Sequence, residues 1–128
     1  MKKLSIPAPV SLVIFFGSRA KGTARSDSDA DVAYVAHREL TSAEWFKLAE
    51  YISAYLYISE DSLDLVDISR ASPLLTRQVA ETGTLIFGDK EEFLRFRVLE
   101  WKRYVDTARF RTAREKALAK KLEYTLRP

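Results

Sequence analysis

Short apolar runs along the chain predict four strands. The runs at residues 11–17 and 31–36 are rich in β-branched and aromatic residues, which is typical of buried strands. Residues 62–68 alternate strictly between two faces and predict a third strand, and the apolar run at 84–87 predicts a fourth. In the alternating strand, Asp64 and Asp67 fall on opposite faces.

Apolar residues at helical spacing predict three helices. Over residues 41–57, Thr41 and Glu44 match a capping box at the start of the first helix. Its core-facing stripe is expected to contain Trp45, Leu48, Ile52, Tyr55 and Leu56. Residues 72–83 begin with Ser-Pro and end in Gly, which predicts a short second helix. A long final helix follows from residue 89, and the aromatic residues expected to pack in the core are Phe93, Phe96 and Trp101.

The order of these elements favours a mixed sheet flanked by helices, in the α/β (α+β) class. The short link between the first two strands allows only an antiparallel or splayed return, which makes the sheet mixed. With 128 residues, 47% of them hydrophobic, the chain is the right size for one core. We therefore expect a single domain over residues 1–128, with its core at about 10–88 and a C-terminal helical region at about 90–128.

Charge is divided unevenly along the chain. Residues 1–94 contain 10 Lys and Arg against 14 Asp and Glu, whereas residues 95–128 contain 11 against 4. A basic helix can contact nucleic acid, an acidic protein or the phosphates of a nucleotide. The simplest interpretation of the basic segment 95–128 is a helix face that is exposed to solvent.

Composition excludes several classes of protein. The chain has no Cys, so it has neither a disulfide framework nor a thiolate metal site. No apolar run approaches the ~20 residues that a membrane span needs. The apolar stretch near the start superficially resembles a signal peptide, but it is short, follows two prolines and runs into a polar motif, so we interpret it as mature protein. These features fit a cytoplasmic protein that does not bind membranes.

Two carboxylates mark the start of the second predicted strand. Asp29 and Asp31 are two positions apart, so their side chains point to the same face and lie close together. Carboxylates held this close repel each other, which raises a pKa or favours a bound cation. Mg²⁺ takes oxygen ligands and binds protein carboxylates alongside substrate phosphates. Taken alone, the pair is more typical of an acidic hairpin with a glycine turn, because Asp is common at strand starts in turns.

A polar segment rich in Gly follows the first predicted strand. Its candidate nucleotide-binding residues are Gly17, Ser18, Arg19, Lys21 and Gly22. The first glycine lets another group approach the backbone, the serine offers donors that suit a phosphate, and the two cations add positive charge. The P-loop pattern is not met, because Thr-Ala stands where Lys-Ser/Thr is required. Combined with the carboxylate pair, the segment predicts a site for a nucleoside triphosphate with Mg²⁺.

The stretch "FGSRAKGTARSDSDADV" resembles the GS-x10-DxD signature of the nucleotidyltransferase superfamily related to DNA polymerase beta. The positions that match the signature are Gly17, Ser18, Asp29 and Asp31. The resemblance continues through "LDLVDI" and "SPLLTRQVAETGTLIFG" and covers nearly the whole chain. The segment "EFLRFRVLEWKRYVDTARF" resembles MntA-type antitoxins, which are encoded beside HEPN-domain ribonuclease toxins of the HepT type. The resemblance implies the nucleotidyltransferase fold.

The resemblance also implies a two-metal site. In that superfamily, the two Asp residues of the DxD motif and a third carboxylate on a later strand bind two Mg²⁺ ions. Asp64 matches the first Asp of the family's "DLV" strand, which implies that it is the third carboxylate and a candidate base for the incoming hydroxyl. Asp67 is the rival. Its alternative interpretation is a residue at the strand end that caps the next turn.

The activity implied by the resemblance is transfer of AMP from ATP to a tyrosine of a HEPN toxin, which silences the toxin. The C-terminal helix is then a candidate docking surface, and a hetero-oligomer is expected. Two alternatives remain open. One is a binding module that neutralises the toxin sterically without catalysis. The other is a transferase acting on a small hydroxyl compound, which normally needs an extra domain to enclose its acceptor. We do not expect direct binding to nucleic acid.

Overall fold

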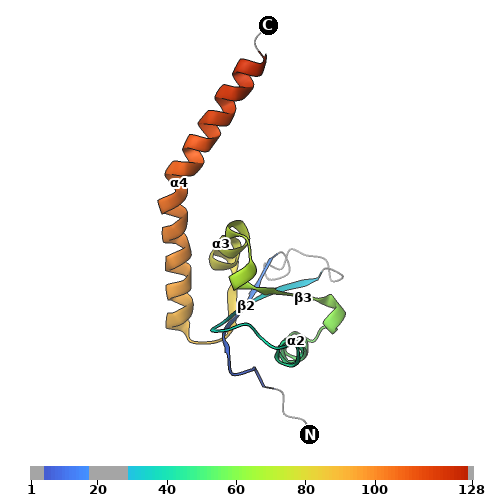
Figure 1. Cartoon of the computed structure of the whole chain (residues 1–128). Helices are drawn as coiled ribbons and strands as arrows, with labels where there is room; N and C mark the ends of the chain where they lie inside the picture. Colours follow the sequence, from blue (N-terminus) through green and yellow to red (C-terminus); the bar gives the residue numbers. More distant parts are fainter. Residues whose placement is uncertain (1–4, 18–28, 127–128) are drawn as a thin grey trace.

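A four-stranded sheet with helices on both faces forms the body of the molecule (Figure 1). The computed structural model describes residues 5–17 and 29–126. The strands are β1 (Val10–Phe16), β2 (Ala30–Ala36), β3 (Leu63–Asp67) and β4 (Thr84–Phe87). The helices are α2 (Ser42–Leu56), α3 (Pro73–Thr82) and α4 (Lys90–Leu126), and short 3-10 turns are η1 (Glu60–Ser62) and η2 (Ile68–Arg70). The predicted order of strands and helices is confirmed.

The sheet is mixed, as predicted. Its strand order is β3-β2-β1-β4. β1 pairs antiparallel with both β2 and β4, whereas β2 and β3 run parallel. Because of these directions, the end of β1 and the starts of β2 and β3 meet at one edge of the sheet. That edge carries the residues of the DxD motif.

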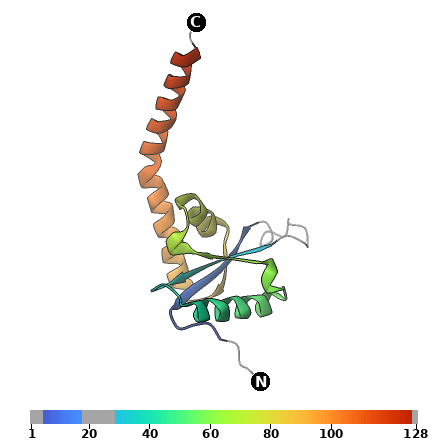
Figure 2. The same cartoon turned by 45° about the vertical axis from the view of Figure 1, so that its right-hand side comes forward.

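Side chains of the sheet alternate between two apolar cores. Figure 2 shows α2 along one face of the sheet and α3 with the start of α4 on the other. Under α2, Val32 and Tyr34 pack with Leu48 and Ile52. On the opposite face, the residues that pack together are Leu12, Ile14, Phe16, Ala33 and Val79. Neighbouring positions of β2 therefore face different cores, which is the alternation expected of a strand covered on both sides.

The predicted capping box starts α2. The Thr41 hydroxyl accepts a hydrogen bond from the Glu44 backbone N–H at 3.2 Å, and the Glu44 carboxylate accepts one from the Thr41 N–H at 2.9 Å. Arg38 also donates to the Glu44 carboxylate, at 2.8 Å. The Arg38 bond is the largest of the contacts that lower the pKa of Glu44 to about 2.

The predicted apolar stripe of α2 is correct for Leu48, Ile52 and Leu56, the last of which packs against the core, and wrong for Trp45 and Tyr55. Leu48 and Ile52 are fully buried. Tyr55 is 54% exposed, and its ring stacks on Tyr51 at the surface instead of entering the core. Trp45 is 36% exposed and packs edge-on against a neighbouring aromatic ring.

The boundaries of α3 follow from its capping residues, as predicted. The Ser72 hydroxyl accepts a hydrogen bond from the Leu75 N–H at 3.2 Å, and a proline occupies the first helical position. Gly83 ends the helix where the chain passes close to β1. A Cβ at Gly83 would collide with the Ile14 side chain and the Val79 carbonyl oxygen. The glycine therefore allows α3 to lie close to the sheet.

The final helix is much longer than the sheet that it covers. α4 has 37 residues, which corresponds to a length of about 55 Å. Figures 1 and 2 show its first part beside α3 and its distal part extending away from the domain. Phe93 and Phe96 pack against the core, as predicted. Trp101 is 65% exposed, so the prediction for it is wrong; at ~100° per residue it lies ~80° around the helix from Phe93.

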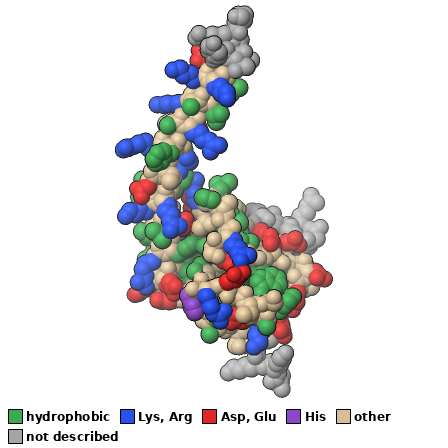
Figure 3. Space-filling view, in the orientation of Figure 1, with side chains coloured by type: hydrophobic (Ala, Val, Ile, Leu, Met, Phe, Trp, Pro, Cys, Tyr) green, Lys and Arg blue, Asp and Glu red, His purple; other side chains and the backbone are tan. Residues whose placement is uncertain are grey.

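The two signs of charge are separated in space as well as in sequence. In Figure 3, Lys and Arg side chains surround the projecting part of α4, while most of the Asp and Glu side chains in view lie on the body of the domain. Within residues 5–17 and 29–126, no helix combines the length and the apolar character needed to cross a bilayer.

The capping box gives a test of the α2 boundary. Replacing Thr41 with Ala removes the hydroxyl that satisfies the Glu44 N–H, so we expect the free energy of unfolding to fall by about 1 kcal/mol. Urea denaturation followed by circular dichroism measures this change. Ser42→Ala, one position inside the helix, is the matched control and should change stability much less. Equal losses in the two variants would contradict the capping role.

Candidate active site

The parallel pairing of β2 and β3 places two carboxylates side by side. In the register of these strands, Asp31 is the partner of Asp64. Neighbouring strands lie about 4.8 Å apart. By alternation, Asp31 points to the same face as Ala33, and Asp64 to the same face as Val66, which is the face covered by α3 and α4. Asp64 is thus the carboxylate of β3 that adjoins the DxD motif.

The environment of Asp31 opposes its ionisation. Burial is the largest cause that raises its pKa above the usual 3.8, followed by the negative charge of Asp64. A side-chain hydrogen bond with Asp64 acts in the same direction, because two carboxyl groups can share a hydrogen bond only while one of them keeps its proton. The charge of Asp29 adds a smaller effect. A cation at this position would relieve all three electrostatic effects.

Gly17 lies directly against the Asp31 side chain. It follows Phe16, which is the register partner of Asp31 across β1 and β2. Its φ of +84° lies in the left-handed region, and a Cβ built on it would overlap the Asp31 carboxylate. The sequence predicts that this glycine permits the close approach of another group. Among the described residues, the group that approaches is the Asp31 side chain.

Asp29 lies just before β2 and is exposed. Its charge reaches Asp31, as the pKa of Asp31 shows. Within the described ranges, no three His, Cys, Asp or Glu side chains converge into a ready metal site. The described structure therefore brings Asp31 and Asp64 together and leaves Asp29 beside them, at the border of the described residues.

Asp67 lies on the opposite face of β3. Its carboxylate accepts hydrogen bonds from the Ser69 N–H at 2.9 Å and the Ser69 hydroxyl at 2.8 Å, which caps η2. The Tyr34 hydroxyl, on the neighbouring strand, also bonds to Asp67. Burial first, and then the charge of Asp67, raises the pKa of Tyr34 above 10.0. Asp67 thus caps the turn that follows β3, which is the second of the two roles that the sequence suggests for it.

Sequence reasoning did not anticipate the part that Tyr34 plays at Asp67. The two residues are register partners in the parallel pairing of β2 and β3. In the sequence, the only sign of this contact is that Tyr34 and Asp67 each fall, by period-two alternation, on the face of their strand that packs under α2. That signal becomes readable only when the register of the two strands is known.

The remaining predicted nucleotide-binding residues lie outside the described residues. These are Ser18, Arg19, Lys21 and Gly22. Their predicted roles stay predictions.

The donors that are described fit a divalent cation of the Mg²⁺ type. Mg²⁺ usually binds one or two carboxylates and keeps other positions for water and substrate phosphates. Asp31 and Asp64 supply two adjacent carboxylates, and the charge of Asp64 adds to burial in raising the pKa of Asp31. Because Gly17 has no side chain, its backbone can lie directly against the Asp31 carboxylate.

Sequence comparisons place the chain among known proteins. The family model described as "Polymerase beta, Nucleotidyltransferase" matches residues 2–92. The chain is also similar to the protein adenylyltransferase MntA of Shewanella oneidensis, with 32% identity over 83 residues. That alignment covers 65% of this chain and 58% of the relative, so the chain matches less than two thirds of the relative's length.

Solved structures agree with this placement. A crystal structure of a toxin-antitoxin with AMP-PNP is similar at a TM-score of 0.69 and 27% identity, over 89% of this chain and 90% of that chain. A complex of a tri-AMPylated Shewanella oneidensis HEPN toxin with an MNT antitoxin matches at a TM-score of 0.62 and 25% identity, over 88% and 86% of the two chains. The family match spans the sheet edge that carries Asp31 and Asp64, and the chain belongs to the polymerase beta nucleotidyltransferase family.

Proposed function

We propose that the chain is a protein adenylyltransferase antitoxin, which transfers AMP from ATP to a tyrosine of a HEPN-domain toxin and so neutralises it. The Asp31–Asp64 pair at the sheet edge is the observation that carries the proposal. The named activity of the MntA relative, together with the AMP-PNP and the AMPylated HEPN toxin in the related structures, supports the choice of nucleotide and acceptor.

Asp29, Asp31 and Asp64 are the proposed metal ligands, and two Mg²⁺ ions are the proposed cofactors. Bound Mg²⁺ supplies positive charge that stabilises the phosphate oxygens and favours the ionised form of the attacking hydroxyl. Asp64 is preferred over Asp67 because it adjoins Asp31, whereas the Asp67 carboxylate is occupied by Ser69. Asp29, whose charge acts on Asp31, is the third proposed ligand.

The proposed reaction forms one bond and breaks one. The tyrosine oxygen of the partner attacks the α-phosphorus of ATP and forms a new P–O bond. The bond between the α-phosphorus and the oxygen that bridges to the β-phosphate breaks, and diphosphate leaves with the electron pair. Asp64 is the proposed base that accepts the tyrosine proton. Asp31, with its neighbour Gly17, orients the ligand set at the sheet edge.

The nucleotide and the partner are assigned to different parts of the chain. Gly17, Ser18, Arg19, Lys21 and Gly22 are the proposed nucleotide-binding residues. The region of about 90–128, which includes α4, is the proposed docking region for the partner, and the core at about 10–88 is the proposed catalytic part. α4 is suited to docking because, among the described helices and strands, none packs against its distal part (Figure 2).

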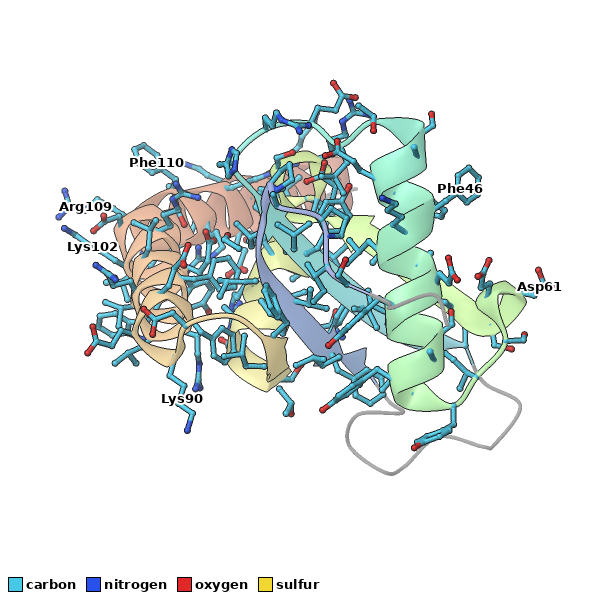
Figure 4. All side chains as sticks on the ribbon, turned by 90° about the horizontal axis from the view of Figure 1, so that it is seen from below. Phe46, Asp61, Lys90, Lys102, Arg109 and Phe110 are labelled. Carbon is cyan, nitrogen blue, oxygen red and sulfur yellow. The ribbon has the colours of Figure 1, made fainter. Side chains whose placement is uncertain are left out.

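The carboxylates give the first test of the proposal. With α-labelled ATP, Mg²⁺ and the HEPN protein encoded beside this chain, the wild type should label the partner. Asp64→Asn should lower the rate of labelling roughly 100-fold or more, because it removes a metal ligand and the base. Asp61→Asn is the matched control, since Asp61 is exposed and points away from the domain (Figure 4), and it should keep the wild-type rate.

Two results would count against this proposal in different ways. No labelling of the partner by the wild type would reject adenylyl transfer. If the Asp29→Asn, Asp31→Asn double variant still protected cells from the toxin, neutralisation would be steric. Asp67→Asn should lower the melting temperature and leave labelling largely intact, because Asp67 caps η2 and holds Tyr34.

The raised pKa of Asp31 predicts a pH-dependent stability in the absence of metal. Its pKa is higher in the folded state than in the unfolded chain, so its unfavourable effect on stability develops as the pH rises from 3.8 through the raised value. At pH 7 with EDTA, Asp31→Asn should therefore raise the melting temperature, and below pH 3.8 the difference should disappear. Mg²⁺ should stabilise the wild type more than the variant. A variant that melts lower than the wild type at pH 7 in EDTA would contradict this.

Gly17 gives a separate test of the geometry. Gly17→Ala forces a side chain into the left-handed region and onto the Asp31 carboxylate, so we expect a loss of about 1–2 kcal/mol of stability. The affinity for Mn²⁺, measured by electron paramagnetic resonance, should fall as well. Gly88→Ala also has a positive φ, of +122°, but it meets Ser11 and Leu12 instead of the carboxylates. This control should lose stability while the folded protein keeps its Mn²⁺ affinity.

A further inference from the structure

A groove of about 700 Å³ runs between α3 and α4. It begins at Ile68, directly after the end of β3, whereas Asp64 lies near the start of that strand. Neither Asp31 nor Asp64 lines it. The groove is therefore a different place from the carboxylate edge, and the proposed chemistry does not use it.

A stack of three side chains forms one wall of this α3–α4 groove. The guanidinium carbon of Arg77, from α3, lies 3.5 Å from the centre of the Tyr104 ring. The guanidinium carbon of Arg111, about two turns further along α4 than Tyr104, lies 3.8 Å from the centre of the same ring. At these distances each group lies almost above the ring centre. Two guanidinium groups on one face would overlap, so they cover opposite faces of the ring. Cation–π contact and planar stacking fix both cations in place.

The positive charges of the groove are unequally compensated. Arg77 donates to Glu81 at 2.9 Å, and Arg103 donates to the buried Glu100 at 2.9 Å. Arg111 donates to the Thr107 hydroxyl at 2.6 Å and the Tyr104 carbonyl at 2.8 Å, both of which are neutral. Among residues 5–17 and 29–126, no carboxylate pairs with Arg111. The groove thus presents an ordered cation without a counter-ion.

The part of the groove that follows the end of β3 is mainly apolar. Ile68, Ala71 and Pro73 line it, and Leu74 beside them is 73% exposed. An occupant that matches both parts carries a carboxylate next to apolar side chains, which describes an acidic amphipathic segment of a protein. A nucleic acid would instead need a continuous track of cations along its phosphates, and the Lys and Arg of the projecting part of α4 point in many directions around the helix (Figure 3).

We propose that the α3–α4 groove is the docking site for an acidic, amphipathic segment of the partner protein. A carboxylate of that segment pairs with Arg111, and its apolar side chains cover Leu74 and Pro73. The planar fork of a guanidinium matches a carboxylate with two parallel hydrogen bonds. The existence of a protein partner rests on the function proposed above, whereas the place and the chemistry of docking come from this groove.

The test compares two charge reversals on the same helix. Arg111→Glu removes the unpaired cation of the groove. Arg109→Glu makes the same change in charge two residues away, on the side of α4 that points away from the domain (Figure 4). Affinity for the HEPN protein encoded beside this chain is measured by isothermal titration calorimetry, and AMP transfer to it is measured in parallel. Circular dichroism melts confirm that each variant is folded, and Arg111→Gln serves as a milder second variant.

We expect Arg111→Glu to weaken partner binding at least about tenfold and Arg111→Gln to weaken it less, with Arg109→Glu within about twofold of the wild type. Equal effects of the two reversals, or no effect, would overturn the docking proposal. So would a folded wild type that fails to bind the partner, or a labelled RNA whose binding depends on Arg111 while partner binding does not. Partner binding that depends on Arg111 without any AMP transfer would reject the proposed activity and leave the docking site standing.

Discussion

The parallel pairing of β2 with β3 is the constraint on which the rest of the site depends. It sets Asp31 against Asp64, two groups that repel each other when both are ionised. The apolar positions on both sides of these residues fix the register, because a shift by one residue would turn Asp31 into the core under α2. The apolar packing of the two strands therefore holds two carboxylates together against their mutual repulsion. A protein without a use for a bound cation would gain stability by losing either one.

Much of this arrangement could be predicted from the sequence. Period-two alternation in β2 and β3 separates Asp64 from Asp67 before any pairing is known, and the capping residues of α2 and α3 mark where those helices begin. The spacing of Asp29 and Asp31 marks them as a pair at the start of β2. These signals are local, and each depends on residues within a few positions of one another.

The features that escaped prediction depend on contacts between distant segments. Tyr55 and Trp101 have helical spacing typical of core residues, but each lies to one side of the helix face that packs against the sheet, and both are exposed. The contact between Arg77 and Tyr104 joins two helices, and no periodic pattern in the sequence indicates it. Gly17 was recognised as a point of close approach, yet the group that approaches it among the described residues is a carboxylate of the next strand.

The projecting part of α4 acts as a lever arm. A tilt of about 10° at its base would move a point about 30 Å along the helix by about 5 Å. Catalytic groups must be held within about 0.5 Å of their productive positions. The angle of the lever is set where α4 meets α3, by the stack of Arg77 on Tyr104 and by the Arg97 guanidinium, which donates to the Ala80 carbonyl at 2.9 Å. Those two contacts therefore set the direction in which the arm leaves the domain.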